Sequence, residues 1–586
     1  MTSHALKRLG LAAGAVALAL VPALVVALGP AAPDAGMWPV SEIGKLDLRA
    51  KGLEIEPEEI FSPDRVGLVY GIVQVGATGS FVSPDGLILT NHHVAFGPAQ
   101  AASTSDRDYI RDGFLARTRG EEIEARGMTA RITESFRDVS ADVLRAVKPS
   151  MSPEARTKAV EQRMKEIVAA AEKAAPGKRA DVSEMFPGKT YVLFLYTYLR
   201  DIRLVYVPPS SIGNFGGEVD NWMWPRHTGD FSFLRAYVGP DGAPAEFAEG
   251  NVPYTPKRFL KVAPEGVREN DFVFLLGYPG RTYRHATSHF LAYEEEIRMP
   301  YVADWYAWQI DLMERMGEAD RAVALKHASR IKGLANTMKN YRGKLQGMKR
   351  VGIVASKKDE EKRLGSFIAA DKDLAARYGD LLDKFAAVYD EMRADAEARM
   401  ILGYLRSNVT LLSLASTIHE ASIERPKKDL EREPAFMDRN FPQTRRRLAM
   451  ALDNFYEPTD RAILKELLLR LAGHPEAPVP PPFAAIAEAA DRESAADAFI
   501  ADLYGRTRLG DKDFALAALD KPAADLGALD DPLLELAASL YPVTKALRAR
   551  EDAWGGALDA LYPPLLEVKS RFEARISSPT PTAPCA

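Results

Sequence analysis

The feature that most constrains the fold is a change of sequence texture at about Ser288. Before it, short runs rich in Val, Leu, Tyr and Phe alternate with turns containing Gly and Pro, a pattern typical of β-strands. After it, stretches rich in Ala, Leu, Glu, Lys and Arg repeat apolar residues at helical spacing almost to the end. The sequence therefore predicts an α+β protein, with a β-domain over residues 36–287 and an α-helical region over residues 288–570.

Several runs in the β-domain are predicted as strands, and their regular spacing indicates a barrel or a sandwich. A helical excursion is expected at about residues 101–175, which are rich in Arg, Glu and Ala. The predicted strands are Val66–Val75, Phe81–Thr90, Lys189–Tyr198, Ile202–Val207, Asp230–Tyr237 and Phe272–Leu276. The predicted helical stretches beyond Ser288 are Asp320–Gly347, Asp373–Leu402 and Thr459–Leu471, and Pro475–Pro482 is expected to be an extended linker.

Charge and cysteine content exclude some classes of protein. The formal net charge of −5 over 586 residues gives no indication of nucleic-acid binding. The chain has one cysteine, Cys585, so it cannot form an internal disulfide.

The N-terminus has the pattern of an export signal. Lys7 and Arg8 precede an apolar run over Leu9–Leu28, and small residues follow. We expect residues 1–35 to be a signal peptide, cleaved between Gly29 and Gly36, which gives a periplasmic or secreted protein without stable membrane insertion. An uncleaved anchor is the alternative, because the apolar run approaches spanning length.

The stretch Gly79–His93 carries the first chemical motif. It reads as a hairpin, with turn residues Pro84-Asp85-Gly86 between two apolar runs. The second run ends at His92 and His93, and neighbours on a strand point to opposite faces, so only one imidazole can face a given cleft. A fixed imidazole is suited to act as a general base near neutral pH. Two loop histidines, one capping and one solvated, are the alternative.

A second motif covers residues 213–230 and contains glycines, two tryptophans, Arg226, His227 and Asp230. Asp230 precedes the apolar run Phe231–Val238, so a strand would hold it rigidly, and a carboxylate there can fix the tautomer of a histidine. A structural turn in which Asp230 caps backbone amides is the alternative. Zinc binding by His92, His93, His227 and an acid is disfavoured, because no HExxH pattern or Cys pair accompanies them.

These motifs together resemble one enzyme family. The stretches Gly79–His93, Asn214–Asp230, Gly277–Thr282 and Ala335–Tyr341 are similar to the bacterial dipeptidyl-peptidase 7 and dipeptidyl-peptidase 11 family of serine exopeptidases. The resemblance runs from Gly36 nearly to the C-terminus. It implies a chymotrypsin-like double β-barrel with a large inserted α-helical cap domain, and a Ser-His-Asp triad. It also implies peptide substrates with a free N-terminus and no metal or organic cofactor, and it is compatible with a homodimer.

Carried over by position, the resemblance makes His93 the triad histidine and Asp230 the triad aspartate. It places Asn221, Trp222 and Asn336 in the pocket for the substrate's N-terminal amine and first residue. A fixed amine leaves room for two residues before the nucleophile, which limits the product to dipeptides. His92 has no implied role, and Val94 stands where the family often has Cys.

The serine that the resemblance requires is missing. The family places it in a Gly-Asn-Ser-Gly-Ser-Pro turn of the second barrel, and this turn is absent from the sequence. Ser80, Ser210 and Ser211 lie in unsuitable contexts. We therefore expect only the first barrel to be represented, an exposed apolar face where the second would pack, low stability or aggregation, and no activity for the chain as written.

The last residues favour one cause. Residues 571–586 break the helical texture. Codons for a family-like Pro-Asp-Ala-Asn-Ser-Thr-Leu-Arg segment, translated in the frame that starts at their second base, encode Pro579–Ala586. We expect a frameshift in the gene or its sequencing, with a natural Pro/Thr tail as the alternative. An HtrA-like periplasmic endoprotease shares the hairpin, but the long helical region argues against it. A non-catalytic peptide-binding protein is the third alternative, favoured by the missing serine.

Overall fold

The computed structural model describes residues 38–280, 283, 285–474 and 479–577. The chain divides into two compact units, Met1–Phe61 and Ser62–Ala586. The predicted signal peptide, Arg281–Thr282 of the Gly277–Thr282 motif, part of the Pro475–Pro482 linker and the tail from residue 578 lie outside the described residues. Among the helices that the structure describes, none combines the length and the apolarity that crossing a bilayer requires.

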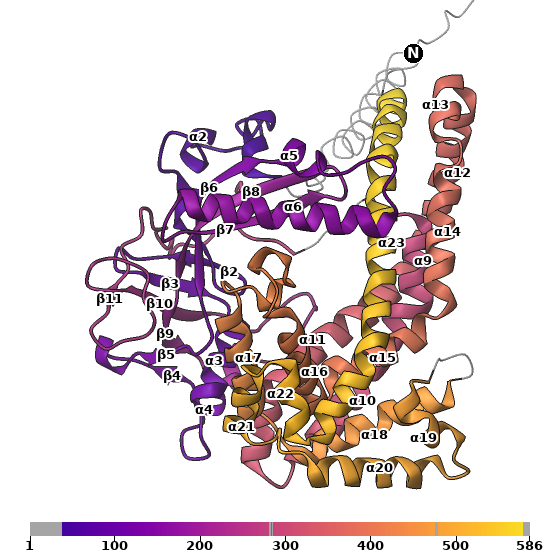
Figure 1. Ribbon diagram of the computed structural model, residues 1–586. Helices are drawn as coiled ribbons and strands as arrows, with labels where there is room; N and C mark the ends of the chain where they lie inside the picture. Colours follow the sequence, from indigo (N-terminus) through magenta and orange to yellow (C-terminus); the bar gives the residue numbers. More distant parts are fainter. Residues whose placement is uncertain (1–37, 281–282, 284, 475–478, 578–586) are drawn as a thin grey trace, which may run out of the picture. The chain divides into compact units, whose positions relative to one another are not determined.

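In the described part of the larger unit, 11 strands form one antiparallel sheet, in the order β4-β9-β10-β3-β2-β1-β6-β8-β7, with β11 beside β10 and β5 beside β9 (Figure 1). The predicted hairpin is confirmed as β2 and β3, in which Ser80 pairs with Leu89. The strands are β1 (Ile72–Gln74), β2 (Thr78–Phe81), β3 (Leu87–Thr90), β4 (Phe114–Leu115), β5 (Ile123–Glu124), β6 (Ala130–Asp138), β7 (Arg179–Phe186), β8 (Thr190–Leu199), β9 (Asp201–Val207), β10 (Ser232–Val238) and β11 (Val252–Pro253).

The sheet holds its own apolar core. Phe81, Ile88, Leu204 and Leu234 are fully buried, and they come from four strands that are neighbours or near neighbours in the sheet. Along β10 the burial alternates at first, as expected for a strand with one face on the core. An α+β fold is therefore observed, while closure of the sheet as a chymotrypsin-like barrel and a cap role for the helices stay predictions.

Two sequence predictions about the sheet are wrong. The expected helical excursion at 101–175 contains β4, β5 and the long strand β6, and its one long helix is α6 (Pro153–Ala174). The period-two alternation of buried Ala130 and Ile132 with less buried Arg131 marks β6, and its partner β8 lies far along the chain. The second error is the predicted strand Phe272–Leu276, which forms no strand.

Beyond the sheet, the first helix begins at Ser288 and helices follow to Ser577. The helices of the described part are α2 (Pro57–Ile60), α3 (His92–Ala102), α4 (Tyr109–Asp112), α5 (Ser140–Leu144), α6 (Pro153–Ala174), α7 (Ser210–Gly213), α8 (Gly217–Asp220), α9 (Ser288–Tyr293), α10 (Met299–Gly317), α11 (Arg321–Val351), α12 (Ile353–Ala370), α13 (Lys372–Tyr378), α14 (Leu381–Ala394), α15 (Ala396–Asn408), α16 (Thr410–Glu424), α17 (Phe441–Asp453), α18 (Glu457–Gly473), α19 (Ala484–Glu488), α20 (Arg492–Arg506), α21 (Lys512–Leu519), α22 (Ala523–Leu526) and α23 (Pro532–Ser577).

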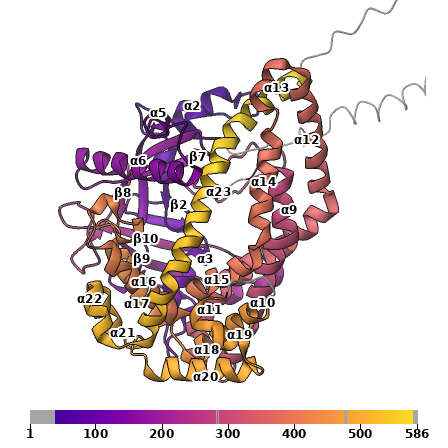
Figure 2. The ribbon, with the colours of Figure 1, turned by 45° about the vertical axis from the view of Figure 1, so that its right-hand side comes forward.

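The 46-residue helix α23 links the helical region to the sheet region. It contacts α6, α14 and α16 (Figures 1 and 2). The Thr157 hydroxyl of α6 donates to the backbone oxygen of Asp552 in α23 at 2.7 Å. Residues 571–577, predicted as the start of an aberrant tail, continue this helix.

Candidate active site

The two histidines stand on the first turn of α3, and not on a strand as the sequence predicted. β3 ends at Thr90, and Asn91 is the N-cap of the helix that begins at His92. Consecutive residues of a helix are about 100° apart, so the two imidazoles still diverge. His92 is fully buried, whereas half of the His93 side chain is exposed. The two histidines therefore face different surroundings, as predicted, but they do so from a helix and not from a strand.

His93 and Asp230 form the pair that the sequence predicted. Nδ1 of His93 lies 2.9 Å from Oδ2 of Asp230. An ionised carboxylate can only accept a hydrogen bond, so the proton sits on Nδ1 and leaves Nε2 as the basic nitrogen. This is the tautomer that a general base requires.

Asp230 has a second bond that fixes the backbone. The amide of His93 donates to Oδ1 of Asp230 at 3.0 Å, so the carboxylate also caps the first turn of α3. Burial by itself raises the pKa of Asp230, but the hydrogen bonds and charge of His93, with the charge of Arg226, outweigh it and lower the pKa to about 2. Asp230 is therefore ionised at neutral pH.

Asn91 ties this pair to the sheet. Its side-chain amide donates to the backbone oxygen of Asp230 at 3.1 Å and to Oδ2 at 3.2 Å. Its own backbone oxygen accepts from the Ser232 hydroxyl at 2.8 Å. Ser232 pairs with Thr90 across β10 and β3. The imidazole and the carboxylate are thus held by the ends of two neighbouring, buried strands.

His92 packs behind the pair. A side chain at Gly213 would come within 2.3 Å of the His92 ring, so only glycine fits there. Phe96 contacts the ring edge to face, with centroids 5.9 Å apart. Burial, with the charge of Lys332, lowers the pKa of His92 to about 4, so this imidazole is neutral at neutral pH.

The three predicted pocket residues are brought together by the structure. Asn221 Nδ2 donates to Oδ1 of Asn336 at 3.1 Å, and Trp222 Nε1 donates to the backbone oxygen of Asn336 at 3.1 Å. Along the chain, Asn221 and Trp222 lie between Gly213, which packs against His92, and Asp230, which bonds to His93. Asn336 comes from α11, more than a hundred residues away.

Helix α11 also holds this loop through residues that the sequence did not single out. Lys332 donates to the side chain of Asn214, and Lys339 donates to the backbone oxygen of Val219. With Asn336 they lie at positions i, i+4 and i+7, which is one helix face. That spacing of polar residues was the signal that could have revealed them.

The helix that carries His93 is tied to α11 as well. The buried Gln100 of α3 accepts from the amide of Ser329 at 3.2 Å, and its side-chain amide donates to the backbone oxygen of Leu325. The helix that carries His93 and the loop that carries Asn221 and Trp222 therefore share one support, α11.

Comparison with known proteins assigns the chain to a family. The family model described as Peptidase S46 matches residues 33–583. The chain belongs to the peptidase S46 family. It is 32% identical over 554 residues to the Asp/Glu-specific dipeptidyl-peptidase of Shewanella putrefaciens, covering 93% of this chain and 74% of that protein. It is 35% identical over 419 residues to dipeptidyl-peptidase 7 of Capnocytophaga gingivalis, covering 68% and 58%.

Solved structures of the S46 relatives agree in fold. The structure of Porphyromonas endodontalis DPP11 in complex with the dipeptide Arg-Glu superimposes with a TM-score of 0.73 at 27% identity, covering 92% of this chain and 78% of that one. The complex with Arg-Asp gives a TM-score of 0.74 at 26% identity, covering 93% and 78%. This S46 chain therefore spans about three quarters of those structures, and less than two thirds of the Capnocytophaga protein.

Among the described residues, no hydrogen bond joins Ser80, Ser210 or Ser211 to His93. The Ser210 hydroxyl donates to the backbone oxygen of Ile110 at 2.7 Å. Within the part of the chain that the structure describes, the hydrogen bonds of His93 run to Asp230, and none comes from a serine hydroxyl. Among the same residues, no three His, Cys, Asp or Glu side chains are gathered as a metal site requires.

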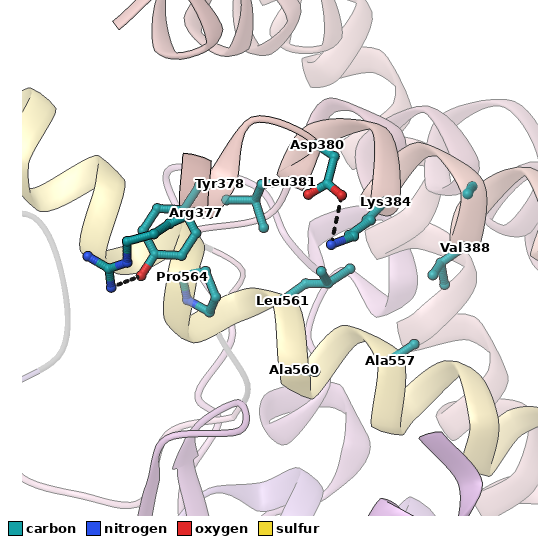
Figure 3. A pocket seen from close by; sticks show the side chains of 11 residues that line it. Arg377, Tyr378, Asp380, Leu381, Lys384, Val388, Ala557, Ala560, Leu561 and Pro564 are labelled. Atoms are coloured by element: carbon teal, nitrogen blue, oxygen red, sulfur yellow. Dashed lines mark hydrogen bonds and ion pairs between the residues drawn. The ribbon is translucent and has the colours of Figure 1, made fainter. Parts of the chain in front are cut away.

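A hollow elsewhere on this S46 chain has no connection to these residues. It lies between α13, α14 and α23 and has a volume of about 460 Å³ (Figure 3). Leu381, Val388, Leu561 and Pro564 supply apolar walls, and Lys384 pairs with Asp380 at its rim. None of the predicted site residues lines it.

Proposed function

We propose that this chain carries the base and the amine pocket of a serine-type dipeptidyl aminopeptidase, which releases N-terminal dipeptides from peptides with a free N-terminus. The observation that carries the proposal is the pair His93–Asp230 at 2.9 Å, at the end of the loop that presents Asn221 and Trp222 to Asn336. The family membership and the dipeptide complexes of the solved relatives support the same reaction class.

In the proposed reaction, Nε2 of His93 accepts the proton of a serine hydroxyl as its oxygen attacks the carbonyl carbon of the second residue. Asp230 keeps Nδ1 protonated and stabilises the imidazolium that forms. The imidazolium then gives its proton to the departing amine, which leaves a dipeptidyl ester on the serine. Water attacks this ester with His93 again as the base, so that the free dipeptide and the serine are regenerated.

The amine pocket would set the length of the released product. A substrate ammonium donates hydrogen bonds, and the side-chain oxygens of Asn221 and Asn336 are acceptors suited to it. Asn336 is fixed by the bonds from Asn221 and Trp222, so an amine held there lies at a set distance from His93. The relatives include both Asp/Glu-specific dipeptidyl-peptidases and dipeptidyl-peptidase 7, so the proposal covers the reaction and not the side-chain preference.

The finer part of the proposal is that the nucleophilic serine is not among the residues of this chain, so that the chain alone is inactive. Its support is that the hydrogen bonds described for His93 involve Asp230 and no serine. We further propose a periplasmic or secreted location, from the Lys7–Leu28 pattern. N-terminal sequencing of the exported protein tests the location, and a mature chain that retains Met1 contradicts it.

Two assays test the function. Fluorogenic dipeptidyl substrates should give no turnover with the full chain, and turnover that survives His93→Ala would show that another group is the base. Turnover that is lost in His93→Ala would keep the base but refute the inactivity.

Binding tests the pocket without catalysis. A pentapeptide with a free amine should bind, as followed by NMR titration, and its N-acetylated form should bind at least about tenfold more weakly, the loss expected for one or two hydrogen bonds. Asn336→Ala should remove this preference. Thr337→Ala, next to it on α11 with its hydroxyl directed back to Gly333, is the matched control. Equal binding of the two peptides by the unmodified chain contradicts the amine pocket.

A further inference from the structure

One stretch of the helical region is basic without interruption. From Arg321 to Lys358, over α11 and the start of α12, the chain has 11 basic residues and no acidic one. The whole chain has 76 Lys and Arg against 81 Asp and Glu, so outside this stretch the acidic residues exceed the basic ones by 16. Separation of charge on this scale creates a local positive potential that attracts anions.

The cations in the first half of the stretch are used inside the protein. Arg321 pairs with Asp108, and Nη2 of Arg330 donates to Oε1 of Gln309 at 2.7 Å. Three lysines donate to oxygens of other segments: Lys326 to Phe455, Lys332 to Asn214 and Lys339 to Val219. These charges therefore fasten α11 to its neighbours.

The cations in the second half of α11 have no such task. They are exposed, and among the described residues none pairs with them or accepts a hydrogen bond from them. They are Arg342, Lys344, Lys349 and Arg350. Single surface cations are ordinary, but a cluster of four without an acidic neighbour in sequence leaves a positive charge that the protein does not neutralise.

This cluster ends at a corner between two helices. Gly352, with φ 60° and ψ 40° in the left-handed region, ends α11 and begins α12. The residues around it, 351–355, are apolar. One basic pair precedes them at 349–350, and a second follows at 357–358. We name residues 349–358 the basic corner.

Local stability accounts for only part of the basic corner. The pair 349–350 lies in the last turn of α11, where cations favour the helix dipole. Lys357 pairs with Glu360 at 2.7 Å, but Lys358 is exposed and has no ion pair among the described residues. Val351, at the vertex, is 67% exposed, and an apolar side chain gains nothing from that position in water.

Charge and apolar surface together indicate the occupant. A polyanion such as nucleic acid is bound by cations and does not require an apolar vertex. The surface of an anionic membrane suits both features, because its phosphates attract the basic pairs and its headgroup region accepts an apolar side chain. Cations on both sides of an apolar vertex can engage such a surface in one approach.

We propose that the basic corner binds the surface of a membrane that contains anionic lipids, without crossing it. Peripheral binding needs no spanning helix, and none of the described helices is of that kind. The proposal does not rest on the proposed function. Asn336 lies on the same helix about 20 Å from Lys349, so the amine pocket and the basic corner are separate places on α11.

Cosedimentation of the full exported chain with vesicles tests the proposal. The vesicles are phosphatidylcholine with one third phosphatidylglycerol, or phosphatidylcholine alone. At about 0.1 M salt the anionic vesicles should bind at least about tenfold more tightly. Most of this difference should vanish in about 1 M salt, where the Debye length falls from about 10 Å to about 3 Å. The neutral vesicles also report any binding by the apolar run Leu9–Leu28.

Substitutions locate the contact. Lys349→Gln with Arg350→Gln should weaken binding to the anionic vesicles at least about tenfold, because two cations near the surface are lost. Val351→Ser keeps every charge and should weaken it about threefold. Lys173→Gln with Lys189→Gln, at two exposed lysines outside the stretch, removes the same charge and should bind as the unmodified chain does. All these positions are exposed, so circular dichroism should show the fold unchanged.

Four results overturn the proposal. The first is equal binding to the two kinds of vesicle, and the second is a loss in the control variant as large as that in the corner variant. The third is binding of a DNA duplex as tight as that of the anionic vesicles, with no effect of Val351→Ser, which would make the corner a general polyanion site. The fourth is self-association without vesicles that Lys349→Gln with Arg350→Gln abolishes, which would make a second copy the occupant.

Discussion

Two apolar runs of this chain, Leu87–Thr90 and Phe272–Leu276, have similar composition and opposite outcomes. The first is strand β3, which pairs with β2 and β10 and has Ile88 fully buried at its centre. The second follows β11 along the chain, forms no strand, and leaves Leu275 almost wholly exposed. The difference shows that apolar composition only permits a strand, and that pairing with a neighbouring strand decides whether one forms.

The same difference explains where chemistry is found. The paired run ends at Thr90, so Asn91, His93 and Asp230 are held by bonds from two neighbouring strands. The run at residues 272–276 forms no strand, and no titratable pair of this geometry is built on it. A pair held in this geometry needs a rigid support, and in this molecule the doubly paired strand provides it.

The largest test of this comparison truncates one side chain in each run. Ile88→Ala should lower the free energy of unfolding by about 2–5 kcal/mol, because it leaves a cavity between strands. Leu275→Ala should change it by less than about 0.5 kcal/mol, because the side chain is already in solvent. Urea unfolding followed by circular dichroism measures both. Equal losses of unfolding free energy in the two variants would mean that Leu275 is as well packed as Ile88, which contradicts the comparison.

The next test uses the buried histidine behind β3. The pKa of His92 is about 4 in the folded chain and 6.5 in the unfolded one, so the unfolded state binds more protons between these values. The free energy of unfolding should therefore fall as the pH falls from 6.5 to 4, by roughly 2–3 kcal/mol from this residue.

Urea unfolding at pH 7.5 and 4.5 measures this loss, and His92→Gln should lose correspondingly less stability than the unmodified chain. His327, whose pKa burial also lowers to about 4, remains in both proteins and provides the common background. The same acid loss with and without His92 would contradict its buried, neutral state.

A smaller effect is expected at Asp230. Its folded pKa of about 2 lies below the unfolded value of 3.8, so its contribution is fully present above pH 4 and is lost as the pH falls toward 2. The loss should be roughly 1–2 kcal/mol. Asp230→Asn should show lower stability at pH 7 and no such loss between pH 4 and 2, measured by thermal unfolding. If this variant loses as much stability between pH 4 and 2 as the unmodified chain, the ionisation of Asp230 is not coupled to folding.

The smallest effect concerns Arg226, whose Nη2 lies 3.7 Å from Oδ2 of Asp230. The side chain is 40% exposed, so Arg226→Gln should cost less than about 0.5 kcal/mol, and the difference should vanish in 1 M salt at roughly a 3 Å Debye length. Arg226→Lys is the control that keeps the charge. A loss as large as that of Ile88→Ala would mean that the paired strands alone do not hold the site.

Local signals were enough for much of the sheet. The hairpin of β2 and β3 follows from its Pro84-Asp85-Gly86 turn, and β8, β9 and β10 follow from their Tyr, Val and Leu content. Strand β6 was missed, because its pairing with β8 joins residues about sixty positions apart and its charged side chains imitate a helix. Residues 272–276 failed as a strand for the reverse reason, since the local signal is present and the partner is not.

The site divides in the same way. A carboxylate at a strand start and two histidines after a hairpin left a His–Asp pair as one of the open alternatives, and the family resemblance selected His93 and Asp230. The helix that begins at His92 was not predicted, although Asn91 is a strong N-cap residue. Contact of Trp222 with Asn336 depends on α11 packing across the sheet region, and only the family resemblance pointed to it.

Asp230 closes the first turn of α3 with one oxygen and orients the imidazole with the other. One carboxylate thus serves both as a structural latch and as a functional contact, so the two properties cannot be lost separately. If the start of α3 unwinds, Asp230 loses both contacts at once, and the imidazole of His93 is no longer oriented. The orientation of the His93 imidazole therefore depends on the correct fold of the first turn of α3, and the Asp230 carboxylate couples the two.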